Sequence, residues 1–167
     1  DVPANGMTLV AEPIEMIAAQ PGATVVIPAD VLERRLEKFG TPVWGEQTGF
    51  LSSRRDGGIN VFASPPRQAT PLVQAEAVLE VTIRAPTYRM TVQGVTASGE
   101  AVDIAAFDHP ADKKTIRIPD ADRFATGDGA FHLRVRVDSI DEASRDIMQR
   151  MEWSFETIDV TLQGKVQ

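Results

Sequence analysis

The sequence contains no cysteine. This absence excludes disulfide bonds, thiolate-ligated metal centres, iron–sulfur clusters and cysteine nucleophiles. Long apolar runs are missing as well. None approaches the ~20 residues that a membrane-spanning helix requires, so we predict no transmembrane segment.

Positive charge is also scarce in this chain. It has 17 lysines and arginines against 24 acidic residues, which gives a net charge of −7. Proteins that bind nucleic acid or anionic lipid need the opposite balance, because they must neutralise phosphates. We therefore expect neither of these as a partner.

Recognisable catalytic motifs are absent from the sequence. It contains no Gly-x-Ser-x-Gly elbow, no Ser-x-x-Lys motif and no glycine-rich phosphate loop after a strand. Carboxylate chemistry stays open, because glycoside hydrolysis needs only a pair of acids. We assign no catalytic residue and expect a protein that is not an enzyme, with a carboxylate-dependent glycan hydrolase or lyase as the alternative.

Alternating hydrophobicity is the clearest pattern that the sequence does contain. Residues 131–138, with the sequence FHLRVRVD, place apolar side chains at every odd position and polar ones at every even position. Such a period of two predicts a strand with one buried and one solvated face. Its recurrence predicts a mainly β protein, an immunoglobulin- or fibronectin-like antiparallel β-sandwich over residues 72–167. The other strands expected there cover residues 79–84, 88–93, 101–107, 114–118 and 153–166.

The last of these strands changes phase along its length. Trp153 and Phe155 occupy odd positions. Ile158, Val160 and Leu162 occupy even ones. Because a slip of one residue moves side chains to the opposite face, we predict a bulge or a bend at residues 156–157. A strand that passes from one sheet to the other would produce the same pattern.

The N-terminal residues 1–63 predict a small α+β segment. A strand is expected at residues 23–27, which are β-branched and bounded by glycine and proline. Asp30-x-x-Glu33 has the spacing of a helix capping box, and Leu32, Leu36 and Phe39 follow at helical spacing. These features together predict a helix over residues 31–39.

Turn signals organise the rest of the N-terminal segment. Asp56-Gly57 lies between two apolar runs and predicts a β-hairpin over residues 49–63. Three prolines in residues 64–71 predict an extended connector, which we take as the boundary of the sandwich. A second capping box at Ser139-x-x-Glu142 predicts a short helix near residues 141–150.

Two regions are candidates for a binding surface. The first is the glycine-rich stretch that carries Trp44 and Phe50, with Arg54 and Arg55 beside it. Aromatic side chains on loops often anchor glycans, peptides or protein partners. The alternative is that Trp44 and Phe50 pack over the helix at residues 31–39 and close the core.

The second candidate surface is the solvated face of residues 131–138, where His132, Arg134 and Arg136 form a basic row. Such a row lies on a solvated sheet face more often than in an acid–base site. Basic neighbours on adjacent strands would extend it into an anion-binding patch, and acidic neighbours would neutralise it. The residues that we expect in these two roles are Arg89 or Arg117, and Glu80 or Glu156.

A metal site has one candidate in the sequence. Asp120, Asp122 and Asp128, interspersed with glycine, supply the oxygen ligands that calcium prefers. Their spacing departs from that of an EF-hand loop, and carboxylates in such loops commonly form turns instead. His109 gives no metal site by itself. We therefore predict no cofactor, with calcium as the alternative.

These observations favour a non-catalytic binding, adhesion or assembly module of an exported or cell-envelope protein. The expected partner is another protein, a second copy of the chain or a glycan. The first residue is Asp1 rather than Met, and we interpret this as a removed signal peptide, with a trimmed terminus as the alternative. The corresponding location is the periplasm, the cell surface or the medium. A virion or filament subunit is a further alternative.

Overall fold

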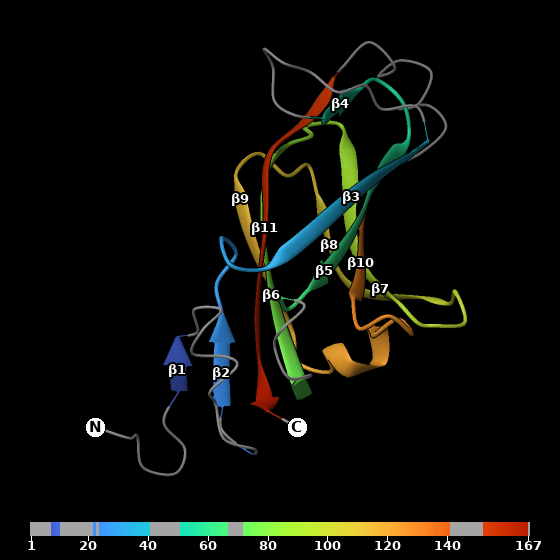
Figure 1. Ribbon diagram of the computed structural model, residues 1–167. Helices are drawn as coiled ribbons and strands as arrows, with labels where there is room; N and C mark the ends of the chain where they lie inside the picture. The colour runs from blue at the N-terminus through green and yellow to red at the C-terminus, as the bar shows by residue number, and fades with distance from the viewer. Residues whose placement is uncertain are drawn as a thin grey trace.

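Two β-sheets pack face to face around a shared hydrophobic core (Figure 1). The computed structural model describes residues 8–10, 22, 24–40, 51–66, 72–140 and 152–166. In these ranges the chain consists largely of strands and contains no α-helix, so the predicted mainly β sandwich is confirmed. The elements are β1 (Thr8–Val10), β2 (Thr24–Ile27), β3 (Glu33–Gly40), β4 (Leu51–Ser53), β5 (Gly57–Ser64), β6 (Leu72–Arg84), β7 (Tyr88–Val95), β8 (Ala101–Asp108), β9 (Lys113–Ile118), the 3₁₀ turn η1 (Ala121–Phe124), β10 (Phe131–Ser139) and β11 (Trp153–Val166).

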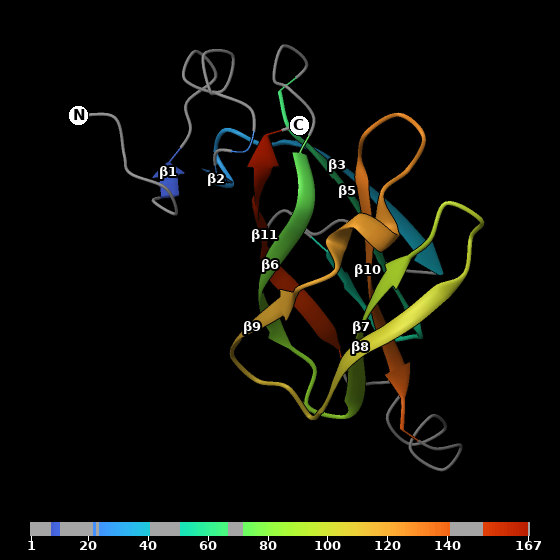
Figure 2. The same cartoon turned by 90° about the horizontal axis from the view of Figure 1, so that it is seen from below.

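The two sheets differ in strand order (Figure 2). The first has the order β1-β2-β11-β6-β9, with β4 also paired to β11, and the second has the order β3-β5-β10-β7-β8. Neighbouring strands run antiparallel except β1 and β2, which are parallel. The odd-numbered apolar residues of β10, from Phe131 to Val137, are buried as the alternation predicts. The immunoglobulin- or fibronectin-like topology stays a prediction.

The bulge predicted in the last strand is confirmed. β11 pairs with β6 through Phe155 and Ile83 on one side of the irregularity, and through Thr157 and Thr82 on the other. Both halves of β11 therefore stay in the same sheet, and the alternative of a strand that changes sheets is not adopted. The bulge restores the inward direction of the apolar side chains after the phase change, so that Ile158 is buried like Phe155.

The helix predicted at residues 31–39 is wrong. A turn in which the Pro28 carbonyl accepts from the amides of Val31 and Leu32 leads directly into β3. This strand pairs with the edge of β5 from Glu33 to Gly40. A helix of nine residues is marginal by itself, whereas the free edge of β5 offers a ladder of backbone hydrogen bonds. The helical spacing of the apolar residues is coincidental here.

The hairpin predicted at residues 49–63 is also wrong. β4 pairs with β11 in the first sheet, whereas β5 belongs to the second sheet, so the chain crosses between the sheets at residues 54–56. The crossing is held by distant partners. The indole Nε1 of Trp153 donates to the Arg55 carbonyl at 2.8 Å, and Asp56 Oδ1 accepts from the backbone N–H of Ser139 at 2.9 Å.

Strands from both sides of the proline-rich connector share the two sheets. β2 pairs with β11 and β5 pairs with β10, and all four contribute to the same core. The helix predicted near residues 141–150 lies outside the described residues. In the described ranges, no helix has the length and apolarity needed to cross a membrane.

Candidate functional site

The solvent side of the second sheet carries the basic row that the sequence singled out. His132, Arg134 and Arg136 alternate with the buried residues of β10, so they lie on this side as predicted. The cross-strand register places side chains from β3, β5 and β7 beside them. We call this surface the outer face; its residues are Arg35, Glu37, Phe39, Asn60, Phe62, Arg89, Thr91, Gln93, Asp103, Asp108, His132, Arg134, Arg136 and Asp138.

One row of the outer face is a stack of three side chains. Phe62 is the cross-strand neighbour of both Arg35 and His132. The guanidinium carbon of Arg35 lies 4.3 Å from the centroid of the Phe62 ring. The His132 ring lies on the other side, with 4.2 Å between the ring centroids and 27° between the planes. Both faces of Phe62 are thus covered, which leaves only its edge for a ligand.

The imidazole of His132 is held in its neutral form. Burial lowers its pKa below 6.5, and the positive charges of Arg134 and Arg35 lower it further, against the opposing effect of Glu37. Nε2 of His132 lies 2.9 Å from Asn60 Oδ1. The same oxygen accepts from Arg134 Nε at 2.9 Å. Because an amide oxygen only accepts, the neutral tautomer carries its proton on Nε2.

We expect the free energy of unfolding to decrease as the pH falls below about 6.5. The unfolded chain protonates His132 at its ordinary pKa, whereas the folded chain resists protonation until its lower pKa is reached. This contribution is complete above the unfolded pKa and is lost as the pH falls through the folded one. Urea unfolding between about pH 5 and 8 measures the dependence.

The His132→Gln variant should weaken this pH dependence, because its amide can still donate to Asn60 but does not titrate in this range. His109→Gln is the matched control, since His109 is an exposed loop residue whose Nδ1 lies 2.7 Å from the Pro86 carbonyl. The carboxyls of Asp108 and Asp128, whose pKa values are lowered, act only at more acidic pH. An unchanged slope in His132→Gln would contradict the assignment.

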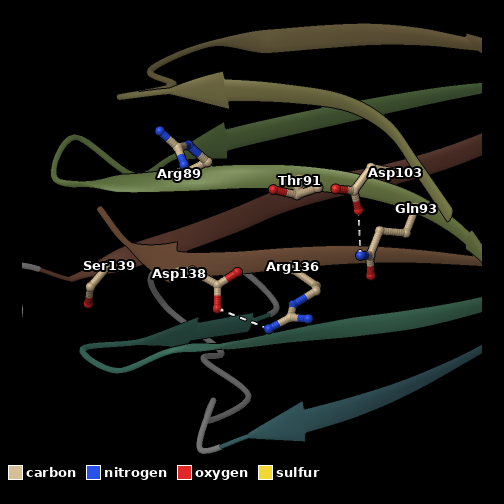
Figure 3. A pocket seen from close by; sticks show the side chains of 7 residues that line it. All are labelled: Arg89, Thr91, Gln93, Asp103, Arg136, Asp138 and Ser139. Atoms are coloured by element: carbon tan, nitrogen blue, oxygen red, sulfur yellow. Dashed lines mark hydrogen bonds and ion pairs between the residues drawn. The ribbon is translucent and has the colours of Figure 1, made fainter. Parts of the chain in front are cut away.

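A shallow depression of about 250 Å³ lies between β7 and β10 (Figure 3). The pairing of β7 with β8 shifts by one residue between Val92 and Gln93. Asp103 therefore lies opposite Gln93, where an unbroken ladder would place Ile104. Gln93 Nε2 then donates to Asp103 Oδ1 at 2.7 Å. The lining residues are Arg89, Thr91, Gln93, Asp103, Arg136, Asp138 and Ser139.

The charges in and around this depression are balanced. Arg136 Nη2 lies 3.3 Å from Asp138 Oδ1, and Arg89 Nε lies 2.6 Å from Asp108 Oδ1. The hydrogen bond from Arg89 lowers the pKa of the Asp108 carboxyl. Arg89 and Arg117 were the two basic residues expected beside the basic row, and the outer face contains Arg89. The carboxylate of Asp108 balances its charge.

Three other expected neighbours of the basic row are absent from the outer face. Arg117 lies on β9, Glu80 on β6 and Glu156 on β11, all in the first sheet. Arg117 forms an ion pair with Glu76 instead. The expectation that these residues meet the row across strands is wrong, because strand order decides which strands are neighbours.

Two buried polar atoms in the depression have no hydrogen-bond partner among the described residues. They are Oε1 of Gln93 and Nε of Arg136. Gln93 is only 7% exposed. Sequence reasoning missed Gln93, because its burial and its contact with Asp103 depend on the bulge in β8.

The other predicted binding residues lie elsewhere. Arg54 and Arg55 are exposed on the crossing segment between the sheets. Trp44 and Phe50 lie outside the described residues. Phe39, predicted to lie on a helix, instead joins the outer face, where the guanidinium carbon of Arg134 lies 5.5 Å from its ring centroid.

The candidate calcium ligands have structural contacts. Asp122 Oδ1 accepts from the Ala75 amide at 3.1 Å, which ties η1 to β6. Asp128 accepts from the Thr126 hydroxyl, and this hydrogen bond lowers the pKa of its carboxyl. Asp120 is exposed just before η1. In the described part of the chain, no group of three or more histidine, aspartate or glutamate side chains is arranged to hold a metal ion.

The fold and the outer face define a two-sheet β-sandwich protein. One of its sheets has a polar surface whose side chains form hydrogen bonds and ion pairs with one another. No protein-family model and no curated protein sequence matches the chain. Among solved structures, it is similar to CBM29_1, a family 29 carbohydrate-binding module from Piromyces equi. The TM-score is 0.44 and the sequence identity 10%, over 84% of this chain and 91% of that one. A likeness this distant shows nothing about function.

Proposed function

We propose that this chain is a non-catalytic binding module that holds its ligand on the outer face, at the depression between β7 and β10. The observation that carries the proposal is the pair of unpartnered buried atoms, Gln93 Oε1 and Arg136 Nε. Leaving a buried donor or acceptor unpaired costs about 1–3 kcal/mol, so a group that pairs with both atoms gains binding energy.

The carboxylates at the site favour binding over turnover. Asp103 accepts from Gln93, and Asp138 is paired with Arg136, so both are engaged as structural acceptors. A general acid at neutral pH needs a raised pKa. The carboxyl of Asp108, which pairs with Arg89 of the lining, has its pKa shifted in the opposite direction. A glycan hydrolase or lyase remains the alternative, and an exported or cell-envelope location is part of the proposal.

Mapping a ligand onto the protein by NMR tests this function. Titration with a panel of soluble polysaccharides and peptides should shift amide resonances of β5, β7 and β10. Resonances of β6, β9 and β11, on the other side of the sandwich, should stay in place. Mass spectrometry of the ligand after long incubation should find it intact.

Three results would contradict the proposal. Shifts confined to the first sheet would place the site elsewhere. Cleavage of the ligand that is lost in Asp103→Asn or Asp138→Asn would make the chain an enzyme. Concentration-dependent shifts without any added ligand, together with a higher mass in light scattering, would favour the filament or virion subunit instead.

A further inference from the structure

Resting on the proposed function, we infer that the ligand is a neutral glycan and that hydroxyl groups of one sugar unit bind between Gln93 and Arg136. This inference adds a ligand class and two contact atoms to the binding face. It follows from the chemistry of the two unpartnered atoms, the charge balance around them and the apolar ring beside them.

The amide of Gln93 is fixed in one orientation. Its Nε2 donates to the carboxylate of Asp103 at 2.7 Å, and a flipped amide would place oxygen against oxygen. The opposite end, Oε1, therefore remains an acceptor toward the depression (Figure 3). Because the side chain is more than nine-tenths buried, this acceptor is held in place before any ligand arrives.

The guanidinium of Arg136 is oriented by one carboxylate. Its Nη2 donates to Asp138 on the same strand, at 3.3 Å from Oδ1. Its Nε–H is buried and has no acceptor among the described residues. Arg136 is the cross-strand neighbour of Thr91, and Gln93 lies two residues farther along β7. An unpaired donor and an unpaired acceptor thus belong to two residues that line the same depression. Each atom is covered by the protein itself, so that a ligand pairs with them as these two side chains shift.

A hydroxyl group matches this pair better than a charged group does. It can accept from Arg136 Nε and donate to Gln93 Oε1, whereas a carboxylate or a phosphate only accepts and an ammonium only donates. The lining contains two arginines, Arg89 and Arg136, and two aspartates, Asp103 and Asp138. This balance provides no surplus charge for an ion, so the depression favours a neutral polyhydroxyl ligand.

A sugar unit also needs an apolar surface for its C–H groups, and Phe39 provides one nearby. Gly58 lies between Phe39 and Arg136 in the cross-strand register, so no side chain separates them. The Phe39 ring reaches over this glycine, because a Cβ there would lie 2.7 Å from Cζ of the ring. The half-buried Phe39 ring is therefore a neighbour of the polar depression across Gly58.

The surroundings disfavour a protein in the same place. Interfaces between proteins have an apolar core, but the described residues expose only one large hydrophobic side chain, Val73, which lies on β6 of the first sheet. β7 and β10 are interior strands, so an added peptide strand finds no free backbone edge there. At about 250 Å³, the depression holds one short part of a longer chain.

Titration calorimetry with soluble neutral polysaccharides of glucose, galactose, mannose and xylose, and with acidic polygalacturonate, tests the inference. We expect binding to at least one neutral polymer and no binding to polygalacturonate. Arg136→Lys keeps the charge but removes the Nε donor, and Gln93→Met keeps the bulk but removes the acceptor. Each should raise the Kd about tenfold, which corresponds to the loss of one hydrogen bond.

Two control variants make the same kinds of substitution, arginine to lysine and glutamine to methionine, at residues of the other sheet. Arg117→Lys changes an arginine of β9 that is also paired with a carboxylate, that of Glu76. Gln163→Met changes an exposed residue of β11. Both controls should bind like the unmodified protein. The Nε–H resonance of Arg136, assigned by through-bond correlation in the unmodified protein, should shift on saturation with the glycan, and this measurement does not depend on how the variants fold.

The outcomes separate this inference from the proposed function. A peptide or protein that shifts the outer face while no glycan binds would overturn the inference and leave the binding module intact. Binding only to polygalacturonate, or to a neutral glycan with an unmoved Arg136 resonance and an unchanged Kd in both variants, would also overturn it. Failure of every ligand to shift the outer face would overturn both.

Discussion

Trp153→Ala is expected to lower the free energy of unfolding by about 3–5 kcal/mol. The indole is fully buried and packs edge-to-face on Phe155, with ring centroids 5.4 Å apart. Its Nε1 also donates to the Arg55 carbonyl on the segment that crosses between the sheets. The variant therefore leaves a cavity and removes a hydrogen bond. Because the free energy of unfolding of a domain is only about 5–15 kcal/mol, this loss is a large fraction of it.

Urea unfolding followed by circular dichroism measures this loss and avoids the change in fluorescence. Trp153→Phe is the matched variant, because it keeps an aromatic ring and removes the N–H. We expect it to cost about 1–3 kcal/mol, from the lost hydrogen bond and the reduced volume. A loss below about 1 kcal/mol in Trp153→Ala would contradict the packing described here.

Gly94→Ala is expected to cost about 2–3 kcal/mol, although alanine adds only one methyl group. Gly94 lies on β7, directly under the Phe124 ring of η1. A Cβ at this position would lie 2.3–2.4 Å from three atoms of that ring. Phe124 is 2% exposed and has no open space to move into, so the methyl group must displace a packed element.

A double-mutant cycle with Phe124→Ala tests this cause. Phe124→Ala alone should cost about 3–5 kcal/mol, and Gly94→Ala should then add less than about 0.5 kcal/mol, because the clash is gone. Gly127→Ala is the control, since a Cβ there meets no atom within 4 Å. An equal cost of Gly94→Ala with and without the Phe124 ring would show that the close contact is not the cause. The measurement is the urea midpoint of each variant.

The strands that the sequence predicted well are those whose evidence is local. The alternation at residues 131–138 predicts both the existence of β10 and which side is buried, because side chains alternate along any strand. The phase change in β11 predicts the bulge for the same reason. Both predictions depend only on a residue and its chain neighbours.

The predictions that failed depend on distant partners. Residues 31–39 carry helical spacing, yet β3 forms because β5 leaves an edge free and Arg34 reaches across to the Ile158 carbonyl on β11. Asp56 precedes a glycine as in a hairpin, yet its carboxylate accepts from Ser139, 83 residues later. Local propensity is a weak guide where such contacts compete with it.

The candidate site divides in the same way. His132, Arg134 and Arg136 could be placed on a solvated face from their spacing alone, and that placement is confirmed. The depression could not be predicted, because the β8 bulge brings Asp103 to Gln93 and the strand order puts β7 beside β10. Phe39 was missed with the helix that was expected to carry it.

The sequence by itself determined the two-layered β architecture, the buried side of strands with clear alternation such as β10, and the absence of thiol chemistry, because these follow from composition and from the period of hydrophobicity. The tertiary structure alone decided the strand order, the crossing at residues 54–56 and the pairing of Gln93 with Asp103. These features arise from contacts between residues far apart in the chain, whose energies no local pattern contains.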